Sequence, residues 1–141
     1  MLMIPTQDFY IELTEASCLE DVERAARLFN ELRLIGIKLC LDDFGTGFSS
    51  LSILKSLPID IIKIDGSFVS GLTKSRTNQA IVKATTTLAS ELGIKVVAEC
   101  VETSKQLKYL TEQGCDYFQG YYFSKPLSLD GLERILPKAV E

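Results

Sequence analysis

Two adjacent aspartates, Asp42 and Asp43, follow an apolar run in the stretch KLCLDDFGTGFSSL at residues 38–51. Two carboxylates side by side repel each other when both are ionised, and a bound cation removes that repulsion. Asp and Gly are also ordinary turn residues, so a polar turn is the simpler interpretation. The sequence therefore leaves open a turn or a cation site at this point in the chain.

Polar side chains also lie at the ends of four other short apolar runs. The carboxyl ends of the strands in a closed β/α barrel meet at one mouth, where active sites form. Because five strand ends in succession carry such residues, we expect one shared site. The residues are Glu12 and Glu15, Asp42 and Asp43, Lys63 and Asp65, Glu99, and Gln119.

Lys63 and Glu99 each have a simpler interpretation as well. Lys63 stands among Ile61, Ile62 and Ile64. If it is buried, it needs a carboxylate partner from a neighbouring strand, whereas an exposed lysine at a sheet edge does not. Glu99 follows the run VVA, and a carboxylate in a surface loop is the alternative to a catalytic one.

The absence of histidine limits the chemistry that this chain can perform. It excludes Ser-His-Asp and Cys-His catalysis and nearly every zinc site. A catalytic metal would be held by carboxylates, which favours Mg²⁺ or Mn²⁺. Cys18, Cys40, Cys100 and Cys115 are widely spaced and form no C-x-x-C pair. We interpret them as small buried hydrophobic residues.

The composition is typical of a soluble globular domain, with 141 residues of which 46% are hydrophobic and 24% are charged. A net charge of −4 argues against a nucleic-acid polymer as a partner. No apolar run approaches the about 20 residues of a membrane span. The first ten residues lack the basic and hydrophobic pattern of a signal peptide. We expect a cytoplasmic protein with no membrane segment in this chain.

Apolar runs and helical periodicity alternate along the chain. Short β-branched runs predict buried parallel strands at residues 9–13, 37–41, 61–64 and 94–98, with a weaker candidate at 115–119. Periodicity predicts helices at residues 19–34, 49–57, 77–92, 103–113 and 129–136. This alternation is the βαβ pattern, so the expected fold class is α/β.

Five segments of the chain form a recognisable set, namely IELTE (11–15), LDDFGTGFSSL (41–51), LPIDIIKIDGSFV (57–69), VVAECVET (96–103) and FQGYYFSKPL (118–127). Together they resemble the EAL-domain family, whose members are cyclic-di-GMP phosphodiesterases with a TIM-like barrel. The resemblance covers essentially the whole chain. It implies hydrolysis of cyclic-di-GMP, a bacterial second messenger, to linear pGpG with two Mg²⁺ or Mn²⁺ ions.

The resemblance also implies a role for each of the strand-end residues. Glu12, Asp42 and Asp43 would be metal ligands that clamp the scissile phosphate and the attacking water between two cations. Glu99 would be the general base on this water, and Lys63 would orient the water and steady the charge.

The remaining strand-end residues would support the site rather than perform the chemistry. By resemblance, Glu15 would steady a mobile loop at residues 43–50, in which Gly45 and Gly47 supply backbone freedom. Gln119 and Asp65 would lie at the mouth of the site, near the substrate.

Two departures from the family pattern affect what we expect of this chain. Cys100 stands where the family usually has glycine, which puts the turn after Glu99 in question. The sequence also lacks the E-A/V-L motif and the asparagine that each supply a metal ligand in the family. A complete barrel needs about 250 residues and eight strands. We therefore expect residues 1–141 to be the C-terminal part of one EAL domain, an incomplete barrel of about five parallel strands.

Three functions remain open at this point. The first is a fragment of a cyclic-di-GMP phosphodiesterase that is inactive alone and self-associates through its exposed strand edges. The second is a non-catalytic EAL-derived module that binds cyclic-di-GMP or a partner protein. The third, an unrelated α/β barrel such as a small-molecule lyase, explains the βαβ pattern but not LDDFGTGFSSL and the segments after it.

Overall fold

The computed structural model describes residues 6, 9–18, 21–47 and 50–135, and it contains one sheet of five parallel strands. The strands follow one another in the sheet in chain order, β1-β2-β3-β4-β5. This arrangement confirms the prediction of an α/β fold with about five parallel strands in an incomplete barrel. The strands are β1 (Tyr10–Thr14), β2 (Lys38–Phe44), β3 (Ile61–Ile64), β4 (Lys95–Ala98) and β5 (Tyr117–Phe118).

Strand β5 is shorter than predicted, but its hydrogen bonds to β4 extend beyond both of its ends. The Asp116 N–H donates to the Val96 carbonyl and the Gln119 N–H donates to the Ala98 carbonyl, both at 2.9 Å. Gln119 is therefore held at the carboxyl edge of the sheet, although it follows the strand itself.

Seven helices are assigned among the described residues, and the sequence predicted five of them. The two short helices that follow β1 and β3 directly, α1 and α4, were not predicted because one turn is too short for a periodic pattern. The helices are α1 (Glu15–Cys18), α2 (Val22–Leu34), α3 (Ser50–Ser56), α4 (Gly66–Ser70), α5 (Arg76–Leu92), α6 (Ser104–Glu112) and α7 (Leu129–Ile135).

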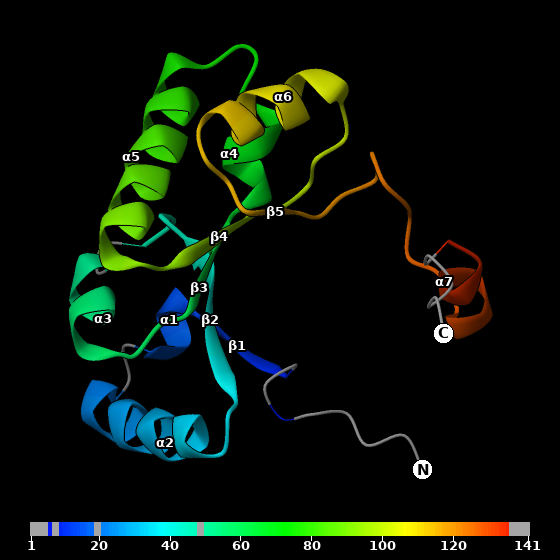
Figure 1. Ribbon diagram of the computed structural model, residues 1–141. Helices are drawn as coiled ribbons and strands as arrows, with labels where there is room; N and C mark the ends of the chain where they lie inside the picture. Colours follow the sequence, from blue (N-terminus) through cyan, green and yellow to red (C-terminus); the bar gives the residue numbers. More distant parts are fainter. Residues whose placement is uncertain (1–5, 7–8, 19–20, 48–49, 136–141) are drawn as a thin grey trace.

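The helices α2, α3 and α5 cover one face of the sheet, where the core lies (Figure 1). Alternate strand residues point into this layer, because successive side chains of a strand face opposite sides of the sheet. Leu39, Leu41, Ile62, Ile64, Val96 and Ala98 come from the strands, and Phe29, Ile53, Val82, Ala89 and Leu110 come from the helices. All of these side chains are buried.

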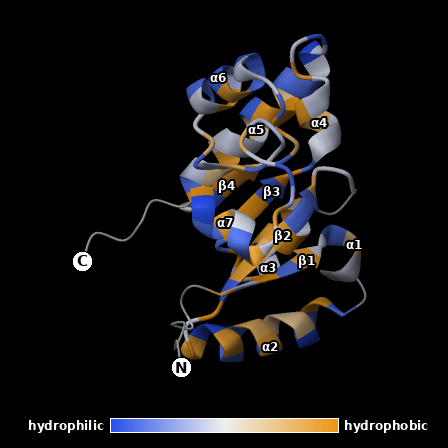
Figure 2. Cartoon of the chain, turned by 90° about the vertical axis from the view of Figure 1, so that its right-hand side faces the viewer, coloured by the Kyte–Doolittle hydropathy of each residue, from blue (hydrophilic) through white to orange (hydrophobic). Residues whose placement is uncertain are grey.

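The opposite face of the sheet carries no layer of described helices (Figure 2). Helix α7 stands apart from the helical layer and has no buried residue (Figure 1). The open face is hollowed by a cavity of about 310 Å³. Its lining combines apolar and polar side chains, namely Tyr10, Glu12, Cys40, Ile61, Lys63, Val97, Tyr117 and Gln119. None of the described helices is long and apolar enough to cross a membrane.

The cysteine prediction is correct for Cys40 and Cys115, which are buried, and wrong for Cys100, which is exposed. Cys100 has a φ of +52°, a left-handed backbone conformation that turns its side chain out of the core. The side chain of Cys18 lies outside the part that the structure describes.

Candidate active site

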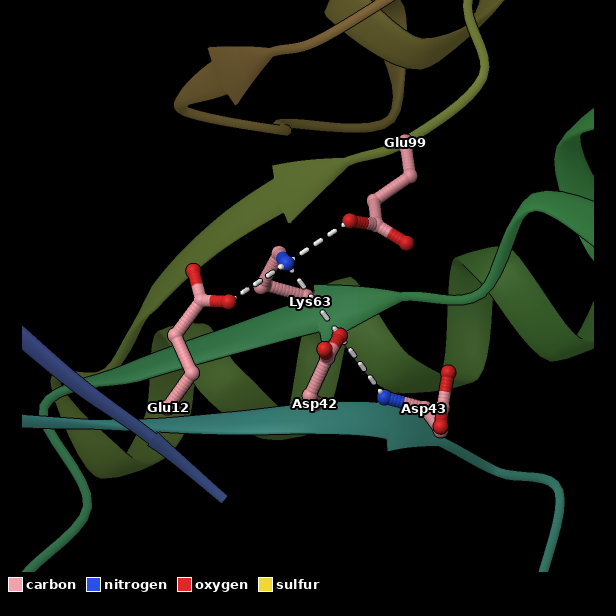
Figure 3. A network of polar contacts seen from close by, with 5 residues as sticks. All are labelled: Glu12, Asp42, Asp43, Lys63 and Glu99. Atoms are coloured by element: carbon pink, nitrogen blue, oxygen red, sulfur yellow. Dashed lines mark hydrogen bonds and ion pairs between the residues drawn. The ribbon is translucent and has the colours of Figure 1, made fainter. Parts of the chain in front are cut away.

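Lys63 lies at the centre of a cluster of carboxylates on the open face of the sheet (Figure 3). Its Nζ atom is 2.8 Å from Glu99 Oε1, 3.2 Å from Glu12 Oε2 and 3.3 Å from Asp42 Oδ1. Glu12, Asp42 and Lys63 come from three successive strands, and Glu99 directly follows the fourth. The structure therefore brings together four of the residues that the sequence analysis assigned to one site.

Strand alternation explains why a lysine occurs among isoleucines. Ile62 and Ile64 point into the helical core, whereas Ile61 and Lys63 line the cavity on the open face. Lys63 is only 6% exposed, so the alternative of an exposed edge lysine is wrong. Glu99 is also not a free surface carboxylate, because only 18% of its side chain is exposed and it pairs with Lys63.

The surroundings of Lys63 keep it positively charged. Burial disfavours the ammonium, but the hydrogen bonds to Glu99 and Glu12 outweigh burial and raise the pKa of Lys63. A lysine with a raised pKa cannot act as a base near neutral pH. Its positive charge can instead orient carboxylates and stabilise negative charge that develops nearby.

The Asp42–Asp43 pair is arranged so that the two carboxylates have different partners. The Asp42 Oδ1 atom faces Lys63 and also accepts a 3.0 Å hydrogen bond from the Asp43 N–H. The register between β2 and β3 shifts between Leu41 and Phe44, and Asp43 has a φ of +56°. This irregular backbone separates the two side chains at the strand end, and Asp43 points away from the Lys63 cluster (Figure 3).

Asp43 remains in an acidic environment after this separation. Its pKa is raised by burial and by the neighbouring carboxylates of Asp42 and Asp65. A nearby cation stabilises the ionised form of such a carboxylate, because the cation offsets the repulsion between the carboxylates. Asp43 also begins a turn, because the Thr46 N–H and hydroxyl both donate to its carbonyl, at 3.2 and 2.8 Å. Both interpretations of the aspartate pair, a polar turn and a cation site, therefore remain open.

Glu15 connects helix α1 to the glycine-rich loop after β2. Its side chain is buried, and its Oε2 atom accepts a 3.3 Å hydrogen bond from the Gly47 N–H. A Cβ atom at Gly47 would lie 2.8 Å from Glu15 Oε1, so a larger residue at this position would require the Glu15 carboxylate to move. The predicted loop at 43–50 is described as far as Gly47 and again from Ser50; residues 48–49 lie outside the described residues.

Asp65 and Gln119 occupy the rim of the cluster. Asp65 caps helix α4, where its carboxylate accepts hydrogen bonds from the Ser67 N–H, at 3.0 Å, and from the Ser67 hydroxyl. Gln119 lines the cavity together with Lys63. It also borders a second hollow of about 270 Å³ beside Glu99 and Cys100. Neither side chain is among the partners of Lys63 Nζ.

The oxygen-rich donor set of Glu12, Asp42 and Asp43 suits a hard divalent cation such as Mg²⁺ or Mn²⁺. As the side chains stand, however, no three carboxylates or thiols among the described residues are grouped closely enough to hold a metal ion. The ammonium of Lys63 takes the place of a cation between Glu12 and Asp42.

Three features near the site were missed in the sequence analysis. Cys40 and Tyr117 line the cavity beside Lys63, and period-two alternation from Asp42 and Gln119 could have identified them. Burial and the neighbouring Glu12 carboxylate raise the pKa of the Cys40 thiol to about 12, so it is not a nucleophile near neutral pH.

The third feature missed in the sequence analysis is the buried Gln106. The pattern T-x-x-Q at Thr103–Gln106 could have identified it as part of a capping box.

The sequence that forms this site was compared with models of known protein families. The model of the EAL domain family matches residues 2–126. The chain belongs to the EAL domain family. The EAL match is supported by a curated relative, the "Cyclic di-GMP phosphodiesterase NbdA" of Pseudomonas aeruginosa, which is 43% identical over 126 residues. The match covers 89% of this chain and 16% of NbdA.

Solved EAL-type structures share the fold of this chain. The "PaMucR phosphodiesterase, c-di-GMP complex" superposes with a TM-score of 0.86 at 36% sequence identity, over 92% of this chain and 52% of that chain. Klebsiella pneumoniae BlrP1, in complex with manganese and cyclic-di-GMP, gives a TM-score of 0.82 at 38% identity, over 87% of this chain and 31% of that chain. The chain thus spans about half of the PaMucR chain and less of the others.

Proposed function

We propose that this chain is part of a phosphodiesterase domain that hydrolyses cyclic-di-GMP to linear pGpG. The observation that carries this proposal is the contact of Lys63 with Glu12, Asp42 and Glu99, within a fold shared with the cyclic-di-GMP complexes of PaMucR and BlrP1. A buried ammonium flanked by carboxylates suits the binding of a phosphodiester and the activation of water beside it.

In this proposal Glu99 is the general base. Its carboxylate accepts a proton from the attacking water, whose oxygen bonds to phosphorus while the bond to the 3′ oxygen breaks; the 3′ oxygen takes up a proton from solvent and leaves as the 3′-hydroxyl of pGpG. Lys63 holds Glu99 in place and stabilises the negative charge that develops on the phosphoryl oxygens. Gln119 and Asp65, on the rim of the cluster, contact the substrate.

Glu12, Asp42 and Asp43 are the proposed ligands of Mg²⁺ or Mn²⁺. When bound, such ions supply Lewis-acid stabilisation of the phosphate and lower the pKa of a bound water. We expect weak binding by the 141-residue chain, because these three carboxylates are not grouped around one point. Titration calorimetry with Mn²⁺ and Zn²⁺ checks this assignment, and tight stoichiometric Zn²⁺ binding would contradict it.

We also propose that these 141 residues are the C-terminal part of the barrel. The open face of the sheet and the 52% coverage of the PaMucR chain support this extent. The direct test is a chimera in which this chain replaces the matching segment of the PaMucR domain. The chimera should release pGpG from cyclic-di-GMP with Mn²⁺ or Mg²⁺, whereas binding without cleavage would favour a non-catalytic module.

The isolated chain is proposed to self-associate and to lack phosphodiesterase activity. Among the described strands, β1 is an edge strand that pairs with β2 alone, and Tyr10 and Tyr117 are 42% and 52% exposed. Edges and faces of this kind favour association with a second copy. Light scattering at micromolar concentration should give more than one chain per particle. A monomer, or metal-dependent turnover by the isolated chain, would contradict this proposal.

A further inference from the structure

The turn that carries Glu99 from strand β4 to helix α6 is held by hydrogen bonds at almost every backbone amide. The Glu99 N–H donates to the Ile64 carbonyl at 3.3 Å, and the Val101 N–H donates to the Gln119 carbonyl at 3.0 Å. The N–H groups of Glu102 and Thr103 both donate to the side chain of Gln106. One side chain therefore holds two consecutive amides of this turn.

Gln106 is a buried polar residue, only 6% exposed, and every polar atom of its side chain has a partner. Its Oε1 atom accepts from the Glu102 and Thr103 N–H groups, each at 2.9 Å, and from the Thr103 hydroxyl at 3.1 Å. Its Nε2 atom donates to the Val69 carbonyl at 3.1 Å. A buried amide is costly unless it is fully bonded, so this arrangement fixes the side chain in one orientation.

The bond to Val69 reaches beyond the capping of α6. Val69 is a fully buried residue of helix α4, 37 residues before Gln106 in the chain. Helix α4 begins directly after Lys63 and Asp65, with Asp65 as its N-cap. Gln106 thus joins two segments. One is the turn after β4, and Glu99 lies in this turn. The other is helix α4, which follows strand β3, and Lys63 lies in this strand.

We propose that Gln106 is a positioning residue, which fixes the turn after β4 against α4 and thereby holds the Glu99 carboxylate at Lys63. A role of Gln106 in catalysis rests on the proposed function, in which Glu99 is the general base. The role of Gln106 in holding the turn does not depend on that function. Helix capping alone would need only the acceptor Oε1, because a capping box joins the side chain to local N–H groups. The donor Nε2 instead bonds to Val69 of helix α4, so this atom links the turn to a second helix.

Two substitutions separate the positioning role from the capping role. Gln106→Glu keeps the acceptor for Glu102 and Thr103 but at neutral pH loses the donor to Val69, whereas Gln106→Leu loses both. Gln79→Leu is the matched control, since Gln79 also donates through Nε2 to a backbone carbonyl, that of Leu72 at 2.9 Å, and Leu72 is not part of this turn.

The experiment measures amide hydrogen exchange and the Glu99 carboxyl carbon signal by NMR in the 141-residue chain. In both Gln106 variants the backbone amide hydrogens of Glu99 and Val101 should exchange about tenfold faster than in the wild type, the factor expected for one lost buried hydrogen bond. The NMR signal of the Glu99 carboxyl carbon should also shift in both variants. Neither amide bonds to Gln106 itself, so a purely local cap would leave them unchanged. Gln79→Leu should leave the exchange rates and the signal at their wild-type values.

Two outcomes would overturn the proposal. The first is unchanged exchange at Glu99 and Val101 in Gln106→Leu while Glu102 and Thr103 exchange faster, which would reduce Gln106 to a helix cap. The second is wild-type behaviour of Gln106→Glu, which would show that the Val69 bond contributes nothing; this variant also decides the matter if Gln106→Leu does not fold. Neither readout uses metal or turnover, so an inactive chimera would count against the proposed function and not against this role.

Discussion

Lys63 Nζ lies 2.8 Å from Glu99 Oε1, and Lys63 belongs to strand β3 whereas Glu99 directly follows the neighbouring parallel strand β4. This ion pair links the sheet to the turn after β4. It also gives the cluster its only described cation within reach of Glu12, Asp42 and Glu99. The stability of the chain should therefore depend on Lys63 in a pH-dependent way.

Replacement of Lys63 by methionine should destabilise the chain by about 3 kcal/mol at pH 7, because it leaves Glu12, Asp42 and Glu99 close together without a cation. The raised pKa of Lys63 means that its contribution is complete below the ordinary lysine pKa of about 10.4. The contribution is lost as the pH rises from there through the folded-state pKa. Urea unfolding at pH 7 and pH 11 checks this.

The control for this experiment is Lys83→Met, since Lys83 is an exposed residue of helix α5. It should change the unfolding free energy little at either pH. A Lys63→Met variant whose deficit is the same at pH 7 and pH 11 would show that lost packing, and not lost charge, is responsible.

Gly66 and Cys100 should be energetically coupled, because a Cβ atom at Gly66 would lie 2.9 Å from Cys100 Cβ and would also collide with its sulfur. Gly66→Ala should cost about 1–3 kcal/mol in the natural background through overpacking. In a Cys100→Gly background the clash is gone, and alanine should be neutral or stabilising by up to about 1 kcal/mol, as it usually is in a helix.

A double-mutant cycle by thermal unfolding measures this coupling. Cys100→Gly should not be destabilising by itself, since Cys100 occupies a left-handed conformation that glycine adopts without strain. Equal effects of Gly66→Ala in the two backgrounds would mean that the turn after Glu99 moves freely away from α4.

Asp116 provides a pH test away from the site. Burial favours its neutral form, but hydrogen bonds from Lys95, at 2.6 Å, and from the Val96 N–H, at 2.9 Å, lower the pKa of Asp116 overall. Its charge therefore stabilises the fold above the ordinary aspartate pKa of about 3.9 and ceases to do so as the pH falls through the folded-state value. Asp116→Asn should lower the melting temperature at pH 7 and match the wild type near pH 2; a constant difference would contradict the assignment.

The sequence predicted the strands well because their residues form continuous apolar runs, and the residues 61–64 were predicted without error. It also predicted that Glu12, Asp42, Lys63 and Glu99 converge, since carboxyl ends of parallel strands lie at one edge. It could not predict the bond between Gln106 and Val69, because no local pattern joins residues 37 positions apart. The exposure of Cys100 was missed because it depends on a positive φ in a turn and not on hydropathy.

The most direct test of the proposed chemistry is the effect of Glu99→Gln on pGpG formation by the chimera with saturating Mn²⁺, measured by chromatography. Glutamine keeps the size of the side chain but cannot accept the proton, so the rate should fall by about 10²–10⁴-fold. Glu91→Gln, at an exposed position of helix α5, should retain the activity of the unmodified chimera. A Glu99→Gln chimera that hydrolyses cyclic-di-GMP at close to the unmodified rate would show that Glu99 is not the base.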